Sequence, residues 1–320
     1  MHPFLVPESD QLRLFELGPD VARLRSLARG YSERTHADAT GRAYASDWRI
    51  FEAWCAAAGR VSLPATEETV SLYLVHELQR RAMSTVDRRV AAIVDRHARA
   101  GQRSPAGGIV RDVLRGARRE LGSEQRRKLA LTAEDLRSMC RQLVQVRKRW
   151  AVRDRAQLLL GFGAGMRCSE LVALDLADVH FKPKGLLVRI RRSKTDQEGR
   201  GRDVGIFAGS RARSCPVRAL KAWLYVRGRA AGPLFFGREG KRMATRTVGV
   251  IVKRAAALAG LDPVGYGSHS LRAGFVTTAV QLRIPETLIM QRTGHRSVET
   301  VARYVRPASV FAVDALAGAL

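Results

Sequence analysis

The sequence predicts a mainly helical protein with a small antiparallel β-sheet, divided into two domains. Apolar residues recur at three- and four-residue steps over most of the chain, which is the pattern of amphipathic helices. Short runs of alternating apolar residues appear only between residues 179 and 207, and they predict strands. Residues 122–128 are polar, basic and without periodicity, which is typical of a linker.

Four helices are expected in the first part of the chain. The first covers residues 35–58, Thr66 begins the second, Ser84 caps the third, and the fourth begins near Pro105. The apolar stripe of the first helix consists of Tyr44, Trp48, Phe51 and Cys55. We interpret this stripe as core, with a base-stacking surface as the alternative. Four helices with short connections predict a compact bundle.

The charge balance indicates a polyanionic partner. The chain has 56 Lys and Arg against 30 Asp and Glu, a net charge of +26. This positive charge is unevenly distributed along the chain. The net charge is −3 over residues 1–79, +9 over 80–131 and +20 over 132–320. A general preference for arginine would explain why Arg is used more often than Lys. It explains less well why Asp and Glu are scarce. Nucleic acid is the natural counterpart of such a charge.

The third and fourth helices have arginines on their outer faces. A solvated surface is the usual place for such side chains, but we favour contact with the phosphates of DNA, which would position the protein without reading sequence. The candidate residues are Arg88, Arg89, Arg96, Arg111, Arg115 and Arg118.

The second part begins with a helix capped by Thr132 and Asp135. Strands are expected at 179–181, 186–190 and 202–207, and Lys194 lies in the turn between the last two. Helices then continue to the end of the chain.

Polar residues gather at the ends of these later helices. His269 and Arg272 are three apart, so one helix face presents both, and Gly294 ends the next helix, which leaves His295 on a loop. Tyr304 follows nine residues later. Guanidinium groups pair with phosphate oxygens, and tyrosine can form a covalent intermediate, so this set fits attack on a phosphodiester.

These motifs resemble the tyrosine recombinases, the phage-integrase and Cre-like family of site-specific DNA recombinases. Gly165-Met166-Arg167 with Glu170 is similar to the family's first arginine box, and Ala273 stands where many members have a second histidine. The resemblance implies that Glu170 supports the active site, with a plain surface carboxylate as the alternative. The catalytic residues that it implies are Arg167, Lys194, His269, Arg272, His295 and Tyr304.

The resemblance also implies a domain plan. Residues 1–30 would be an extension, 31–122 a SAM-like helical core-binding domain, 123–131 a linker, and 132–320 an α+β catalytic domain of the DNA breaking-rejoining type. The two domains would clamp duplex DNA, cut it through a 3′-phosphotyrosyl intermediate and rejoin it without ATP, metal or another cofactor. A type IB topoisomerase or telomere resolvase and a non-cutting DNA-binding module are the alternatives.

The almost uncharged tail, Val310 to Leu320, is expected to form a final helix that docks on a neighbouring protomer or folds onto its own domain. As a site-specific recombinase, the enzyme would act as a homotetramer on two paired DNA sites. The four cysteines form no paired motif and no apolar run is long enough to span a membrane, so we expect a cytoplasmic protein.

Overall fold

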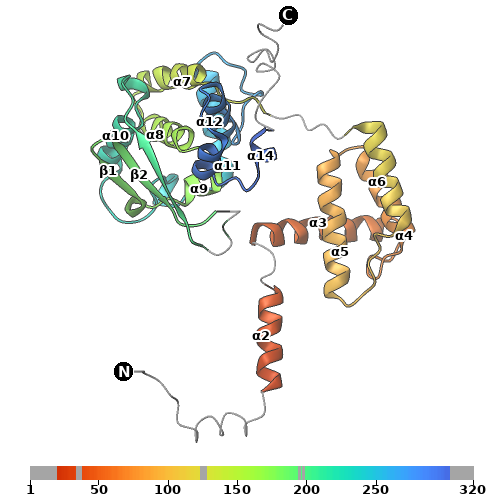
Figure 1. Cartoon of the computed structure of the whole chain (residues 1–320). Helices are drawn as coiled ribbons and strands as arrows, with labels where there is room; N and C mark the ends of the chain where they lie inside the picture. Colours follow the sequence, from red (N-terminus) through yellow and green to blue (C-terminus); the bar gives the residue numbers. More distant parts are fainter. Residues whose placement is uncertain (1–19, 34–37, 123–127, 194–195, 197–198, 303–320) are drawn as a thin grey trace, which may run out of the picture. The chain divides into compact units, whose positions relative to one another are not determined.

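A computed structural model of the chain describes residues 20–33, 38–122, 128–193, 196 and 199–302. The chain divides into two compact units, Met1–Arg126 and Arg127–Leu320. Both are mainly helical, and the second contains one three-stranded antiparallel sheet, so the predicted fold class is confirmed (Figure 1). None of the described helices is both long enough and apolar enough to cross a membrane.

The first unit contains the helices α2 (Val21–Glu33), α3 (Asp38–Ala57), α4 (Glu67–Leu78), α5 (Met83–Arg99) and α6 (Gly108–Leu121). The apolar stripes of α3, α4, α5 and α6 meet in one core, whereas Val21, Leu24 and Leu27 of α2 are exposed. α3 packs against α5, and α4 packs against α6. Trp48, Phe51 and Cys55 of the predicted stripe are buried, whereas Tyr44 is only half-buried. The interpretation of this stripe as core is therefore confirmed for those three residues.

Two predicted helix starts in this unit have different outcomes. Thr66 caps α4, since its hydroxyl accepts a hydrogen bond from the Thr69 N–H at 3.1 Å. The predicted cap at Ser84 is wrong, because α5 already begins at Met83 and its N-cap is Ala82, which provides no side-chain hydrogen bond. Ser84 therefore lies inside the first turn of α5, where a hydroxyl cannot cap the helix.

The second unit is organised around α8. Its elements are α7 (Ala133–Gln145), α8 (Arg149–Gly163), α9 (Cys168–Ala173), β1 (Val179–Lys182), β2 (Gly185–Ile190), β3 (Arg202–Phe207), α10 (Pro216–Arg227), α11 (Thr245–Leu258), α12 (Ser270–Gln281), α13 (Glu286–Thr293) and α14 (Val298–Ala302). α8 packs against α7, α9, α10 and α12. Such a position requires apolar residues all around the helix. Ala156, Leu158, Leu159 and Leu160 satisfy this requirement, because all four are buried.

The sheet has the strand order β1-β2-β3, with Val188 of β2 paired to Val179 of β1 and to Val204 of β3. Leu186, Val188 and Ile190 alternate along β2 and are all buried in the core. The predicted strands are thus confirmed. The connection from β2 to β3 is the segment in which Lys194 was expected; Lys194 itself lies outside the described residues.

Candidate active site

The buried guanidinium of Arg272 lies at the centre of the site. Arg272 is in the first turn of α12 and is only 2% exposed. Its Nη1 donates to the carbonyl oxygen of Gly165 at 2.9 Å and to that of Thr293 at 2.7 Å. These two carbonyls come from segments far apart in the sequence, so Arg272 ties the end of α8 to the end of α13.

Two glycines make these carbonyl positions possible. Gly165 and Gly294 have φ angles of +59° and +69°, in the left-handed region that favours glycine. A Cβ atom on Gly165 would lie 2.6 Å from Cδ1 of Phe275 and 2.9 Å from Cγ2 of Thr293. Gly294 ends α13 in the αL conformation, which turns His295 away from the helix axis. The sequence-based expectation that Gly294 ends this helix is confirmed.

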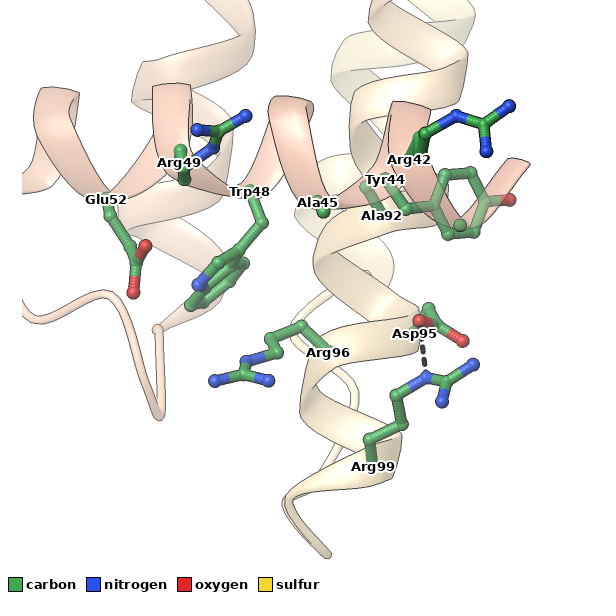
Figure 2. A pocket seen from close by; sticks show the side chains of 11 residues that line it. Arg42, Tyr44, Ala45, Trp48, Arg49, Glu52, Ala92, Asp95, Arg96 and Arg99 are labelled. Atoms are coloured by element: carbon green, nitrogen blue, oxygen red, sulfur yellow. Dashed lines mark hydrogen bonds and ion pairs between the residues drawn. The ribbon is translucent and has the colours of Figure 1, made fainter. Parts of the chain in front are cut away.

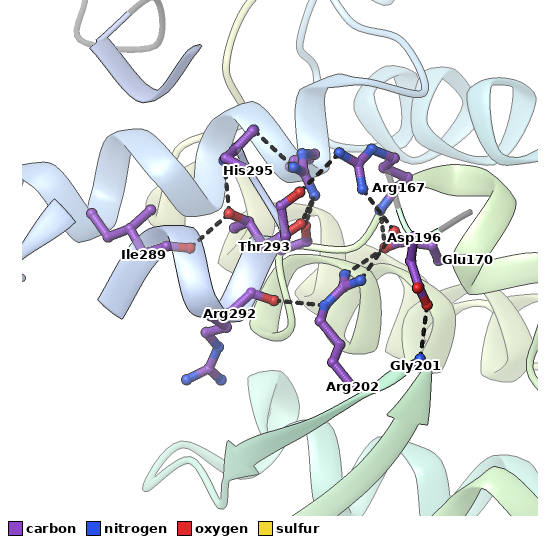
Figure 3. Close-up of polar contacts among 12 residues, drawn as sticks. Arg167, Glu170, Asp196, Gly201, Arg202, Ile289, Arg292, Thr293 and His295 are labelled. Carbon is purple, nitrogen blue, oxygen red and sulfur yellow. Dashed lines mark hydrogen bonds and ion pairs between the residues drawn. The ribbon is translucent and has the colours of Figure 1, made fainter. Parts of the chain in front are cut away.

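Glu170 holds a second guanidinium in place. Arg167 is the N-cap residue of α9, and its Nη1 donates to Oε1 of Glu170 at 2.9 Å. Nη2 of Arg167 donates to the carbonyl oxygen of Gly294 at 3.2 Å. The carboxylate of Glu170, which is buried, also binds Arg202 of β3 (Figure 3). Hydrogen bonds from both terminal nitrogens therefore fix the orientation of the Arg167 guanidinium group.

His295 is buried against Arg272 and has a strongly lowered pKa. Its Nε2 lies 2.7 Å from Nη2 of Arg272. Its Nδ1 lies 2.7 Å from Oγ1 of Thr293 (Figure 3). Burial lowers the pKa of His295 to about 4, with further lowering from the positive charges of Arg272 and Arg167. At neutral pH the imidazole is uncharged in this state.

His269 is the N-cap residue of α12 and keeps an exposed surface. Neighbouring protein atoms desolvate its imidazole and lower its pKa, and Arg272 and Arg167 lower it further. Both effects favour the unprotonated form of this imidazole.

The structure thus gathers four of the six predicted catalytic residues around the start of α12: Arg167, His269, Arg272 and His295. The other two, Lys194 and Tyr304, lie outside the described residues. The described chain reaches Ser193, which forms a β-bridge with Asp196, and Ala302, the last residue of α14. The roles assigned to all six residues remain predictions.

Arg202 and Thr293 were missed by sequence reasoning. Arg202 binds Glu170, and Thr293 binds both His295 and the carbonyl oxygen of Ile289. Neither belongs to a motif that we recognised. Thr293 directly precedes Gly294-His295, and this adjacency was the one available signal.

The predicted phosphate-binding arginines of the first unit differ in their surroundings. Arg89 is buried at 5% exposure, where it forms ion pairs with Glu77 and Asp47. This position departs from the expected outward-facing side chain and identifies Arg89 as part of the interior. Arg88 donates to Asp47 at 2.7 Å, and Arg118 lies 2.6 Å from Asp87. All three of these arginines therefore already have an acidic partner.

Arg115 is 3.6 Å from Asp112, a loose pair between two exposed side chains. Arg111 and Arg96 are also exposed. Arg96 lines a hollow of about 700 Å³ between α3 and α5, which Figure 2 shows from close by. The guanidinium carbon of Arg96 lies 5.6 Å from the ring centroid of Trp48. The charged and aromatic lining consists of Arg42, Tyr44, Trp48, Arg49, Glu52, Asp95, Arg96 and Arg99.

Comparison with known proteins identifies the family. The family model described as "Phage integrase family" matches residues 130–309, more than half of the chain. The chain belongs to the phage integrase family. This integrase-family protein is a tyrosine-type site-specific recombinase.

Its relatives agree with this assignment. The chain is 37% identical over 304 residues to the "Integrase/recombinase xerD homolog" of Selenomonas ruminantium, covering 92% of this chain and 89% of that protein. It is 34% identical over 168 residues to "Tyrosine recombinase XerC 1" of Ralstonia nicotianae, which covers 48% of this chain and 49% of that one.

Solved structures show the same fold. The Tn1549 transposon integrase, in complex with transposon right end DNA, matches with a TM-score of 0.65 and 15% identity, over 89% of this chain and 96% of that one. The XerH site-specific recombinase, bound to its difH substrate, matches with a TM-score of 0.58 and 20% identity, over 78% of this chain and 73% of that one.

Proposed function

We propose that this integrase-family enzyme cuts and rejoins duplex DNA at a specific site by transesterification, with Tyr304 as the nucleophile and a 3′-phosphotyrosyl intermediate. The observation that supports this most strongly is the pair of guanidinium groups, Arg167 and Arg272. They are bound to the carbonyl oxygens of neighbouring residues, Gly294 and Thr293. Two imidazoles lie next to them.

Arg167 and Arg272 would stabilise the negative charge on the non-bridging phosphate oxygens. Protein oxygen atoms hold Nη1 of both side chains, so these guanidinium groups are largely oriented before charge develops in the transition state. Guanidinium groups remain charged at any working pH and present parallel N–H donors that match phosphate oxygens. Loss of one such donor is expected to slow cleavage on the order of a hundredfold.

Protons would be handled by three residues. His269 would accept the proton of the Tyr304 hydroxyl or order that part of the site, and its lowered pKa favours the unprotonated form that this role needs. Lys194 would donate a proton to the departing 5′ oxygen. His295 would hydrogen-bond the phosphate.

The phosphotyrosyl bond would retain the energy of the phosphodiester that was cut. Rejoining the strand by attack of a 5′ hydroxyl on this bond therefore needs no ATP. The positive charge at the phosphate would come from the arginine side chains, so the proposed steps use no metal ion or other cofactor.

The hollow between α3 and α5 would contact the DNA backbone in the first unit. Arg42, Arg49 and Arg96 place positive charge around Trp48, and such contacts orient a protein on the duplex without reading sequence. Exposed arginines on α6, such as Arg111, would extend this contact. Buried Arg89 would instead hold the bundle together.

The active enzyme would be a homotetramer on two paired sites, linked by the C-terminal segments. A groove of about 530 Å³ is lined by Phe275, Ala279, Leu282, Ile284 and Leu288. Leu282 is 69% exposed and Leu288 is 53% exposed. Burial of this apolar surface against another segment would therefore be energetically favourable. The nearly uncharged segment Val310 to Leu320 of a neighbouring protomer would fit it.

The test uses nicked suicide duplexes whose sequences are first selected for binding from a randomised pool. The wild-type protein should form a covalent adduct that resists denaturation, and Tyr304→Phe should bind the same duplex without an adduct. A lack of adduct with either protein would support a non-cutting DNA-binding module. An adduct without strand exchange between two sites would support a topoisomerase-like activity.

A second experiment tests the proposed acid. Lys194→Ala should slow cleavage of an ordinary 5′ oxygen, because that leaving group needs a proton. A duplex with a 5′-bridging sulfur at the scissile bond should restore the rate, since the thiolate leaves without one. Failure of this rescue would show that another residue donates the proton.

A further inference from the structure

Thr293 connects His295 to the backbone of α13 through its hydroxyl group. Oγ1 of Thr293 lies 2.7 Å from Nδ1 of His295 and donates to the carbonyl oxygen of Ile289 at 2.6 Å. Thr293 is fully buried, and it occupies the last helical position before Gly294. Figure 3 shows dashed lines that link Ile289 to Thr293 and Thr293 to His295.

The groups at the two ends of this series of hydrogen bonds, Arg272 and the carbonyl of Ile289, determine where each proton in it lies. Nη2 of Arg272 lies 2.7 Å from Nε2 of His295, and a guanidinium can only donate, so Nε2 must be unprotonated. The neutral ring then has its proton on Nδ1, which donates to Oγ1 of Thr293. The Thr293 hydroxyl donates onward to the carbonyl of Ile289, which can only accept. This is the single arrangement in which all three contacts are hydrogen bonds.

We propose that Thr293 is a positioning residue that keeps the proton on Nδ1 of His295, so that Nε2 is the one nitrogen whose protonation changes during the reaction. This proposal rests on the proposed function, in which His295 binds the scissile phosphate. The hydroxyl of Thr293 accepts a hydrogen bond from Nδ1–H in both the neutral and the protonated ring. Its contact therefore does not have to change when Nε2 gains a proton.

The arrangement gives His295 two states with different partners. Without DNA, Nε2 accepts a hydrogen bond from Arg272. When a phosphate binds, Arg272 turns its donor to a phosphate oxygen, and the negative charge of the phosphate favours a proton on Nε2. Nε2 then donates to the phosphate while Nδ1 still donates to Thr293. Phosphate binding would thus be accompanied by uptake of one proton from solvent, which charges the imidazole.

The charged and titratable groups around His295 favour the neutral state before DNA binds. They are Arg272 from α12, Arg167 from the start of α9, His269 from the start of α12 and Arg202 from β3, and each lowers the pKa of His295. A phosphate would neutralise much of this positive charge. Arg272, Arg167 and Arg202 cannot replace the hydroxyl of Thr293, because a guanidinium group only donates hydrogen bonds.

The test compares Thr293→Val, which keeps the shape but lacks the hydroxyl, with Thr293→Ser, which keeps the hydroxyl. In ¹⁵N spectra of the DNA-free full-length protein, with the His295 signals assigned by their absence in His295→Gln, wild type and Thr293→Ser should show a protonated Nδ1. Thr293→Val should lose the hydrogen-bonded Nδ1 proton signal, because no acceptor for that proton remains. If Thr293→Val does not fold, Thr293→Ala provides the same loss of acceptor.

Cleavage of the suicide duplex gives the second readout. In Thr293→Val the protonated ring has no acceptor for Nδ1, so the limb of the pH–rate profile due to His295 should move to lower pH. The rate at neutral pH should fall on the order of tenfold, and Thr293→Ser should restore it.

A spectrum and a pH profile of Thr293→Val that match the wild type would overturn the proposal. So would a Thr293→Ser variant that behaves like Thr293→Val. Because the spectra are recorded without DNA, they test the Thr293 contact even if no covalent adduct is found. Failure of the proposed function is thereby distinguished from failure of this inference.

Discussion

Glu170 and Arg202 form a two-point ion pair, with Oε2 of Glu170 2.8 Å from Nη2 of Arg202 and Oε1 3.3 Å from Nη1. The same carboxylate also accepts a hydrogen bond from Nη1 of Arg167. One buried side chain therefore joins α9 to β3 and orients a guanidinium of the candidate site. Nε of Arg202 donates to the carbonyl oxygen of Arg292 at 3.2 Å, which extends the link to α13.

Replacing Glu170 by glutamine should lower both stability and activity. Two guanidinium groups would share a neutral partner in a buried position, so the free energy of unfolding should fall by about 3 kcal/mol. Denaturant unfolding measures this change, and the suicide-duplex assay should show slower cleavage at temperatures where the variant is folded. Glu239→Gln is the matched control, because Glu239 pairs with Lys241 on the surface and should leave both quantities unchanged.

Arg89→Ala should destabilise the first unit by about 3 kcal/mol, because it leaves Glu77 and Asp47 buried with less compensation. Arg111→Ala on the exposed face of α6 should leave stability unchanged. Thermal or denaturant unfolding of the two variants provides the comparison. Equal stability of Arg89→Ala and wild type would place Arg89 back among the candidates for DNA contact.

Sequence patterns predicted most of the fold because apolar periodicity directly reflects burial. The three strands were found from alternation, and the capping box of α7 is present, with Thr132 and Asp135 exchanging hydrogen bonds of 3.0 and 3.1 Å. Ser84 failed as a cap because the same three-residue spacing also occurs inside helices. Local spacing alone does not fix where a helix begins.

The site was harder to predict where the interaction is between distant residues. Arg167, His269, Arg272 and His295 were identified through their motifs. Arg202 was missed because its partner, Glu170, is 32 residues away on another element. Arg89 was misplaced for the same reason, since the helical pattern that places its neighbours outside does not reveal that Asp47 and Glu77 lie opposite it.

His295 should make stability depend on pH. Its pKa is about 4 in the folded state against 6.5 for an ordinary histidine, so the unfolded chain binds more protons between these values. The contribution is complete above pH 6.5 and is lost as the pH falls toward 4. The free energy of unfolding of His295→Gln, measured over this range, should fall less steeply than that of wild type. Parallel curves would contradict the buried neutral imidazole.

Arg96→Ala should lower the affinity for DNA and should make that affinity less dependent on salt concentration. If Arg96 contacts one phosphate, the slope of log affinity against log salt concentration should decrease by about 0.9. Arg60→Ala is the control in the same unit, because Arg60 already pairs with Glu68 at 2.9 Å. Binding by fluorescence anisotropy at several salt concentrations gives the slopes. If the slope is unchanged for Arg96→Ala but reduced for Arg111→Ala, the DNA phosphates are contacted by α6 and not by the hollow between α3 and α5.

The central claim is that the phenolic oxygen of Tyr304 becomes joined to the DNA. The most direct test is to trap the adduct on a suicide duplex, digest protein and DNA, and locate the attached nucleotide by mass spectrometry. We predict a 3′-phosphonucleotide on the peptide that contains Tyr304, and none with Tyr304→Phe. Attachment to another residue, or to a 5′ phosphate, would contradict the account.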